Sequence, residues 1–131
     1  MIRFALPILI LGACAANAAM PQKTSSRDDA AIAKTLAGLT PGTPQDCIDS
    51  NRVGETRGYP NTILYVGGKN KVWRNDTVGS CDGLSRGDLL VVKSISGRIC
   101  SGDQASTRAR LGGMLTSSCA LGKFVPYTRA K

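Results

Sequence analysis

The chain has 131 residues, a net charge of +8 from 17 Lys and Arg against 9 Asp and Glu, and no histidine. This length is typical of one small domain. The lack of histidine excludes Ser–His and Cys–His nucleophile pairs, histidine-ligated zinc and the most common general base. The cations are scattered rather than gathered in runs of five or six, so nothing indicates a specific nucleic-acid site.

The N-terminal segment is typical of an export signal. One basic residue, Arg3, precedes an uncharged apolar run at residues 4–13, and small residues follow that run. This order predicts a secretory signal peptide over residues 1–19, because the apolar run is too short to span a bilayer as a helix. Ala16 and Ala18 fit the small-x-small pattern before an ordinary cleavage site. Loss of the leader removes Arg3 and leaves a net charge of +7.

A lipoprotein leader that ends before Cys14 is the alternative to this signal peptide. Residues 11–14 (LGAC) resemble the lipobox in which the cysteine is lipidated and becomes the new N-terminus. Ala15, rather than an aspartate, follows that cysteine, and the resemblance then implies an outer-membrane address. The predicted location is therefore the periplasm, with a lipid anchor at Cys14 left open.

Residues 20–45 are predicted to be a linker that contains one short helix at 27–39. Ser26 is a plausible N-cap with Asp29 three residues on, as in a capping box. Prolines and a glycine after residue 39 end the helix. Its apolar residues at helical spacing are Ile32, Leu36 and Leu39. Such a stripe docks more often on its own domain than on a partner.

Residues 46–131 are predicted to form a mainly β domain, either a small barrel or a sandwich of about seven short strands. The segment GGKN at 67–70 reads as a hairpin loop between two strands. The predicted strands are 47–53, 62–66, 72–75, 89–95, 98–100, 107–111 and 123–128.

The cysteines predict two disulfide bonds in this domain. Cys14 belongs to the leader, and the four that remain are an even set, for which disulfides are the default in an oxidising compartment. Zinc is less favoured, because zinc sites usually hold their ligands in close pairs. Three pairings are open to four cysteines. If the first and last strands meet to close a barrel, the pairs are Cys47–Cys119 and Cys81–Cys100.

Six short segments are spaced through residues 46–126: CI at 47–48, TILY at 62–65, WRN at 73–75, CDGL at 81–84, ICSGD at 99–103 and CALGKFVP at 119–126. This ordered set resembles a family of small exported Gram-negative domains of unknown function. Its members share four cysteines, a C-x-G-L turn, a C-x-x-D turn and a closing C-x-L-G-x-F-x-P. Residues 111–118 fit the pattern least. The resemblance implies no activity, because the family has none assigned.

The carboxylates of the β domain read mainly as turn formers, since most of them lie beside Gly, Asn, Ser or Cys. Asp82 and Asp103 each follow a cysteine closely. A Cys81–Cys100 bond would make them neighbours, and a Ca²⁺ site there is the alternative to two capped turns. We expect no catalytic residue, no cofactor and no metal.

The predicted hairpin carries the best candidate site, for an anionic ligand. Lys69, Lys71 and Arg74 lie close to Trp73, and cations beside an aromatic ring can hold an anionic sugar or nucleotide. On a strand, however, Lys71 and Trp73 share one face while Arg74 lies on the other. Trp73 itself is more typical of a core residue than of an exposed platform.

The expected function is that of a non-catalytic binding or accessory domain of the cell envelope. Lipopolysaccharide phosphates and peptidoglycan carboxylates are the anions that such a charge would attract. The alternatives are a structural domain that docks on another envelope protein and a small hydrolase built on a carboxylate pair. Membrane contact is expected only through the lipid anchor.

Overall fold

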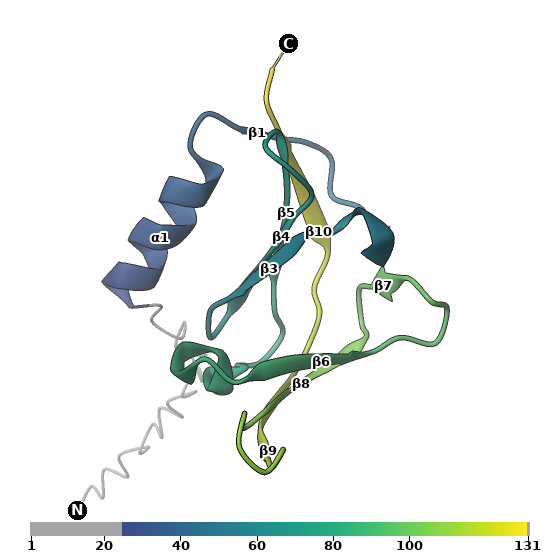
Figure 1. Ribbon diagram of the computed structural model, residues 1–131. Coiled ribbons are helices and arrows are strands. Elements are labelled where there is room, and N and C mark those ends of the chain that lie inside the picture. Colours follow the sequence, from purple (N-terminus) through teal and green to yellow (C-terminus); the bar gives the residue numbers. More distant parts are fainter. Residues whose placement is uncertain (1–24, 131) are drawn as a thin grey trace, which may run out of the picture.

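The computed structural model describes residues 25–130, so the predicted leader and the lipidation candidate Cys14 lie outside the described residues (Figure 1). Within 25–130 no helix is long and apolar enough to cross a bilayer. The elements are α1 (Ser26–Leu36), β1 (Thr40–Pro41), β2 (Cys47–Ile48), η1 (Ser50–Arg52), β3 (Glu55–Gly58), β4 (Thr62–Val66), β5 (Lys71–Asp76), η2 (Asp82–Arg86), β6 (Leu89–Lys93), β7 (Ile99–Cys100), β8 (Gln104–Arg108), β9 (Leu115–Ala120) and β10 (Phe124–Thr128).

The strands form three antiparallel sheets, which confirms the mainly β class. The largest has five strands in the order β1-β10-β5-β4-β3, the second pairs β2 with β7, and the third has the order β6-β8-β9. These sheets do not close into a barrel, and a sandwich-like arrangement is the one that fits. Figure 1 shows β6, β8 and β9 at the end of the molecule opposite the C-terminus.

The β4–β5 hairpin follows the sequence pattern closely. β4 spans the predicted residues, and the Gly67 amide donates to the Lys71 carbonyl across the predicted loop at 2.9 Å. Gly67 is required there by a close approach, because a Cβ would lie 2.6 Å from the ring of Trp73. That indole is buried, as predicted, with 3% of its surface exposed.

The five-stranded sheet buries residues on both faces. On one face Tyr65, Trp73 and Phe124 join the main core, and the rings of Tyr65 and Phe124 lie 5.6 Å apart. The Tyr65 hydroxyl is buried without a hydrogen-bond partner in the described residues, and burial together with the charge of Asp103 raises its pKa. The opposite face presents Leu64 to the helix.

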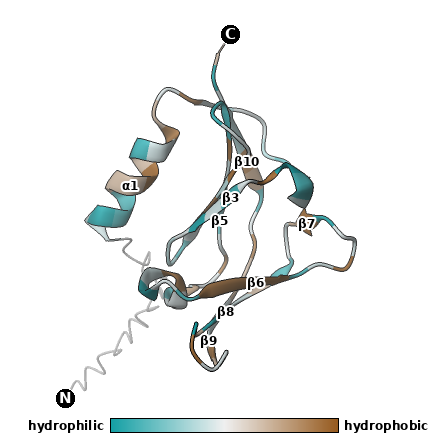
Figure 2. Cartoon of the chain, viewed as in Figure 1, coloured by the Kyte–Doolittle hydropathy of each residue, from teal (hydrophilic) through white to brown (hydrophobic). Residues whose placement is uncertain are grey.

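Helix α1 covers that second face with the predicted stripe. Ile32 is buried there, with Leu36 and Leu39 partly buried beside it, so the stripe docks within the chain as expected. Figure 2 shows the helix with an apolar side and a polar side. The N-cap is Ser25 rather than the predicted Ser26, since the Ser25 hydroxyl accepts the Asp28 amide. The helix also ends at Leu36, three residues early.

The strand predictions differ from the structure in three ways. The strand predicted at 107–111 is β8, which begins at Gln104 and ends at Arg108, before the turn. The segment predicted as one strand at 47–53 is β2 followed by the single turn η1, because the Asp49 carboxylate accepts the Asn51 amide and turns the chain. Three strands were missed: β1, β3 and β9. Each of them is short or polar, and each is held by its sheet partner rather than by an apolar pattern of its own.

The predicted disulfide pairing was wrong. The bonds are Cys47–Cys100 and Cys81–Cys119. The first and last strands do meet, but the first strand is β1, where Thr40 lies opposite Thr128. Cys47 lies on β2, which pairs with β7 and places Cys47 directly opposite Cys100. The expectation that the first and last strands pair was therefore correct, but Cys47 does not lie on the first strand.

The closing segment crosses from β9 to β10 at Gly122. Asn75, which is fully buried, donates to the Gly122 carbonyl at 2.7 Å and accepts the Gly122 amide at 3.0 Å. Only glycine fits there, because a Cβ would overlap the carbonyl oxygen of Asp76. Leu121 and Phe124 on either side are both buried in the main core. The glycine and the two apolar residues of the closing motif thus have structural roles.

Candidate functional site

A basic hollow of about 300 Å³ lies between the start of β5, the β2–η1 segment and the residues before β7. Its framework is fixed by the Cys47–Cys100 bond and by Gln45, whose backbone exchanges two hydrogen bonds with Phe124. The residues that line the basic hollow are Gln45, Ile48, Asp49, Arg52, Lys71, Trp73 and Arg98.

Three cations of the basic hollow have no carboxylate within 4.0 Å among the described residues. The four ion pairs of residues 25–130 involve other cations, so Arg52, Lys71 and Arg98 are not neutralised locally. Asp49 is the one carboxylate of the lining, and its oxygen already accepts the Asn51 amide. The basic hollow therefore carries a net positive charge.

A largely buried aromatic ring and several hydrogen-bond donors lie beside the basic hollow. The Lys71 ammonium lies 4.8 Å from the centroid of the Trp73 ring. The Trp73 indole N–H is buried and has no acceptor in the described part of the chain. Arg98 makes one long hydrogen bond, at 3.4 Å, to the Cys47 carbonyl. The remaining donors of Arg98 and the charge of Lys71 can meet an anion.

Of the predicted anion-binding residues, the structure places only Lys71 in this hollow. Lys69 lies exposed in the 67–70 turn. Arg74 lies on the opposite face of β5, where its Nε is 3.0 Å from the Asp76 carboxylate. Arg52 and Arg98 were missed because they are distant in sequence. The signal that could have found them is their spacing from Cys47 and Cys100, which the disulfide brings together.

The carboxylates of the β domain are engaged in structural roles. No group of three or more metal-ligating side chains lies together in residues 25–130. Asp82 and Asp103 are not joined by the expected bond between their neighbouring cysteines. The hydrogen bond from Arg57 lowers the pKa of Glu55. The partners are Lys123 for Asp46, the Asn51 amide for Asp49, Arg57 for Glu55, Arg74 for Asp76, Ser80 for Asp82, Arg86 for Asp88 and the Cys100 amide for Asp103.

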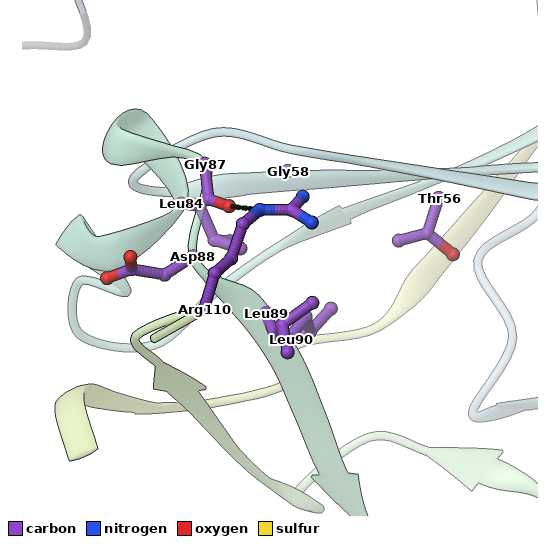
Figure 3. A pocket seen from close by; sticks show the side chains of 8 residues that line it. All are labelled: Thr56, Gly58, Leu84, Gly87, Asp88, Leu89, Leu90 and Arg110. Atoms are coloured by element: carbon purple, nitrogen blue, oxygen red, sulfur yellow. Dashed lines mark hydrogen bonds between the residues drawn. The ribbon is translucent and has the colours of Figure 1, made fainter. Parts of the chain in front are cut away.

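A second hollow, of about 370 Å³, lies between β3 and the η2–β6 segment (Figure 3). Arg110 reaches across it and donates to the Gly87 carbonyl at 2.6 Å. Leu84, Leu89 and Leu90 supply the apolar side chains near it, while the Asp88 carboxylate points away from Leu90 in Figure 3. This hollow offers one cation and an apolar lining, and it lacks a convergent set of polar groups.

A third hollow, of about 620 Å³, is open and polar. Two carboxylates, Asp28 and Asp82, are among its lining residues. Asp28 belongs to the first turn of α1, and Asp82 accepts the Ser80 hydroxyl. Of these hollows, the basic hollow has the most specific set of groups. No family model, curated protein or solved structure matches the chain, so the resemblance to exported Gram-negative domains stays a prediction.

Proposed function

We propose that this protein is a non-catalytic exported binding domain that holds an anionic group in the basic hollow. The observation that carries the proposal is the convergence of Arg52, Lys71 and Arg98 on one hollow, where the described residues place one carboxylate, Asp49, and no carboxylate within 4.0 Å of the three cations. Three like charges repel one another, and their convergence is destabilising unless an anion joins them.

The chemistry of the lining favours a phosphate or a carboxylate group. Guanidinium groups bind both anions through paired N–H donors, and the lysine adds a point charge. The Trp73 ring is buried beneath Lys71 and serves to hold the lysine ammonium 4.8 Å from its centroid. The volume of about 300 Å³ lies at the lower end for ligand sites, so one small head group fits and a larger molecule would extend outside.

The predicted compartment restricts which anions the protein can meet. The leader at residues 1–19 predicts export, and the two disulfides are compatible with an oxidising compartment. We therefore place the protein in the periplasm, either free or anchored through Cys14. Lipopolysaccharide phosphates and peptidoglycan carboxylates are the abundant anions of that compartment, and both fit the charge of the hollow.

The test compares two variants that lose the same charge. Arg52→Gln with Arg98→Gln removes two cations from the hollow, whereas Lys69→Gln with Arg74→Gln removes two from the hairpin outside it. Binding to purified lipopolysaccharide and to peptidoglycan fragments is measured between 0.1 M and 1 M salt. Hydrogen bonds to charged groups contribute about 1.5–3 kcal/mol each, so the hollow variant should bind at least tenfold more weakly.

The hairpin variant should keep most of the affinity, because its residues lie outside the hollow. The difference in affinity between the two variants should shrink toward 1 M salt, since Arg52 and Arg98 are both exposed and exposed charges are screened. The proposal would be overturned if both variants lost the same affinity, or if the unaltered protein did not bind either ligand at low salt.

A further inference from the structure

The turn between β8 and β9 exposes a group of large apolar side chains. Leu111, Met114 and Leu115 are 92%, 73% and 57% exposed. Leu115 lies across from Arg108, which lies across from the exposed Leu89 on β6, so these residues share the outer face of the three-stranded sheet. Figure 2 shows the apolar character of β6 in that sheet. Clustered exposed apolar residues of this kind mark interaction sites.

The turn holds these side chains on a fixed tip. The Ala109 amide donates to the Met114 carbonyl at 2.9 Å and closes the loop. Gly112 and Gly113 both take positive φ angles, +81° and +65°, which lets the chain reverse within four residues. Arg108 donates to the Gly113 carbonyl at 3.0 Å and braces the turn. The tip, residues 111–115, therefore projects at the end of the molecule opposite the C-terminus (Figure 1).

The charged residues of the turn itself, Arg108 and Arg110, are both positive, and the nearby Asp88 is paired with Arg86. Neither Arg108 nor Arg110 takes part in an ion pair within the described residues. The sequence has no Asp or Glu from Gln104 to its end at Lys131. Lys93 adds a third cation on the outer face of β6, next to the exposed Val91.

The apolar side chains and the arginines together distinguish between two candidate binding partners of the tip, a second copy of the chain and an anionic bilayer. A second copy of the chain docking tip to tip would bring the same arginines together, and like charges across an interface cost several kcal/mol. An anionic bilayer offers phosphates to the arginines and an acyl layer to the apolar side chains, which is how interfacial membrane segments bind. The charge complementarity selects the bilayer.

We propose that the tip inserts Leu111, Met114 and Leu115 into the interface of an anionic phospholipid bilayer, with Arg108 and Arg110 on the lipid phosphates. This contact is separate from the basic hollow, which lies next to Lys71, the residue that pairs with Thr128 near the C-terminus. It also adds membrane binding through the folded domain to the lipid anchor considered at Cys14.

The test uses the full-length chain with a reporter at the tip, so that membrane contact by any other segment does not give the signal. Leu111→Trp places an indole on the tip. Ile95→Trp is the control, because Ile95 is fully exposed and lies away from the tip, in the loop between β6 and β7. Each is titrated with vesicles of pure phosphatidylcholine and with vesicles that contain one third phosphatidylglycerol. Trp73 is buried and contributes a constant background.

The Leu111→Trp emission should shift to the blue on the phosphatidylglycerol vesicles and should be quenched by brominated acyl chains, while Ile95→Trp should not respond. Adding Arg108→Gln or Arg110→Gln should weaken the partitioning by about fivefold for each arginine, and 1 M salt should weaken it similarly. The proposal is overturned if the tip reporter does not respond, or if both reporters respond equally. It is also overturned if the blue shift appears without vesicles and grows with protein concentration, which would identify a contact between copies.

Discussion

The Asn75 side chain should contribute a large share of the stability, because it supplies both hydrogen-bond partners of Gly122. Asn75→Leu keeps a similar volume but leaves the Gly122 amide and carbonyl without partners. Each polar group buried without a partner costs about 1–3 kcal/mol, and the apolar leucine offsets a part of that cost, so the free energy of unfolding should fall by about 2–4 kcal/mol. For a domain of this size the urea midpoint should fall by about 1–3 M.

Urea unfolding with intact disulfides, followed by the fluorescence of Trp73, measures this change. Asn70→Leu is the control, since Asn70 lies exposed in the 67–70 turn and should change stability by less than about 0.5 kcal/mol. Asn75→Asp keeps the acceptor for the Gly122 amide but loses the donor at neutral pH. Burial should raise the pKa of the new carboxyl, so its stability should recover as the pH falls and the protonated form donates. A loss at Asn75→Leu no larger than the control, or an Asn75→Asp variant without pH dependence, would refute the reasoning.

Three further predictions concern the core. Cys81→Ala with Cys119→Ala should lower the free energy of unfolding by about 4 kcal/mol, given a sequence separation of 38 residues. Non-reducing peptide mapping of the unaltered protein should find Cys81 joined to Cys119. Gly83→Ala should lose about 1–3 kcal/mol in the same urea assay, because its Cβ would overlap the Thr107 hydroxyl; unchanged stability would contradict this packing. Because burial raises the pKa of Tyr65, the folded state keeps this hydroxyl protonated at a pH where the unfolded chain ionises it. The buried Tyr65 side chain therefore stabilises the fold fully below about pH 10, and this stabilisation is lost as the pH rises further. Tyr65→Phe should remove that loss in unfolding measured from pH 9 to 11.

The local features of this fold could be predicted from the sequence. The run TILYV predicted β4 with its full bounds, and the two glycines after it predicted the hairpin. The helical spacing of Ile32 and Leu36 predicted a helix that packs on its own sheet. Trp73, as the one tryptophan of a chain with few aromatic residues, was expected in the core, and it is buried there. These features depend on side-chain periodicity and on turn chemistry within about ten residues, and both can be read along the chain.

The tertiary structure alone decided the disulfide pairing and the candidate sites. The strand β1 consists of two exposed residues that pair with β10, so no apolar pattern in the segment predicts it. Because β1 was missed, the strand that carries Cys47 was taken to be the first strand. The correct bond, Cys47–Cys100, joins the segments that place Arg52 and Arg98 around one hollow. Strand pairing between distant segments is selected by the packing of the whole core. The sequence therefore specifies which residues are charged, and only the fold determines which charges meet.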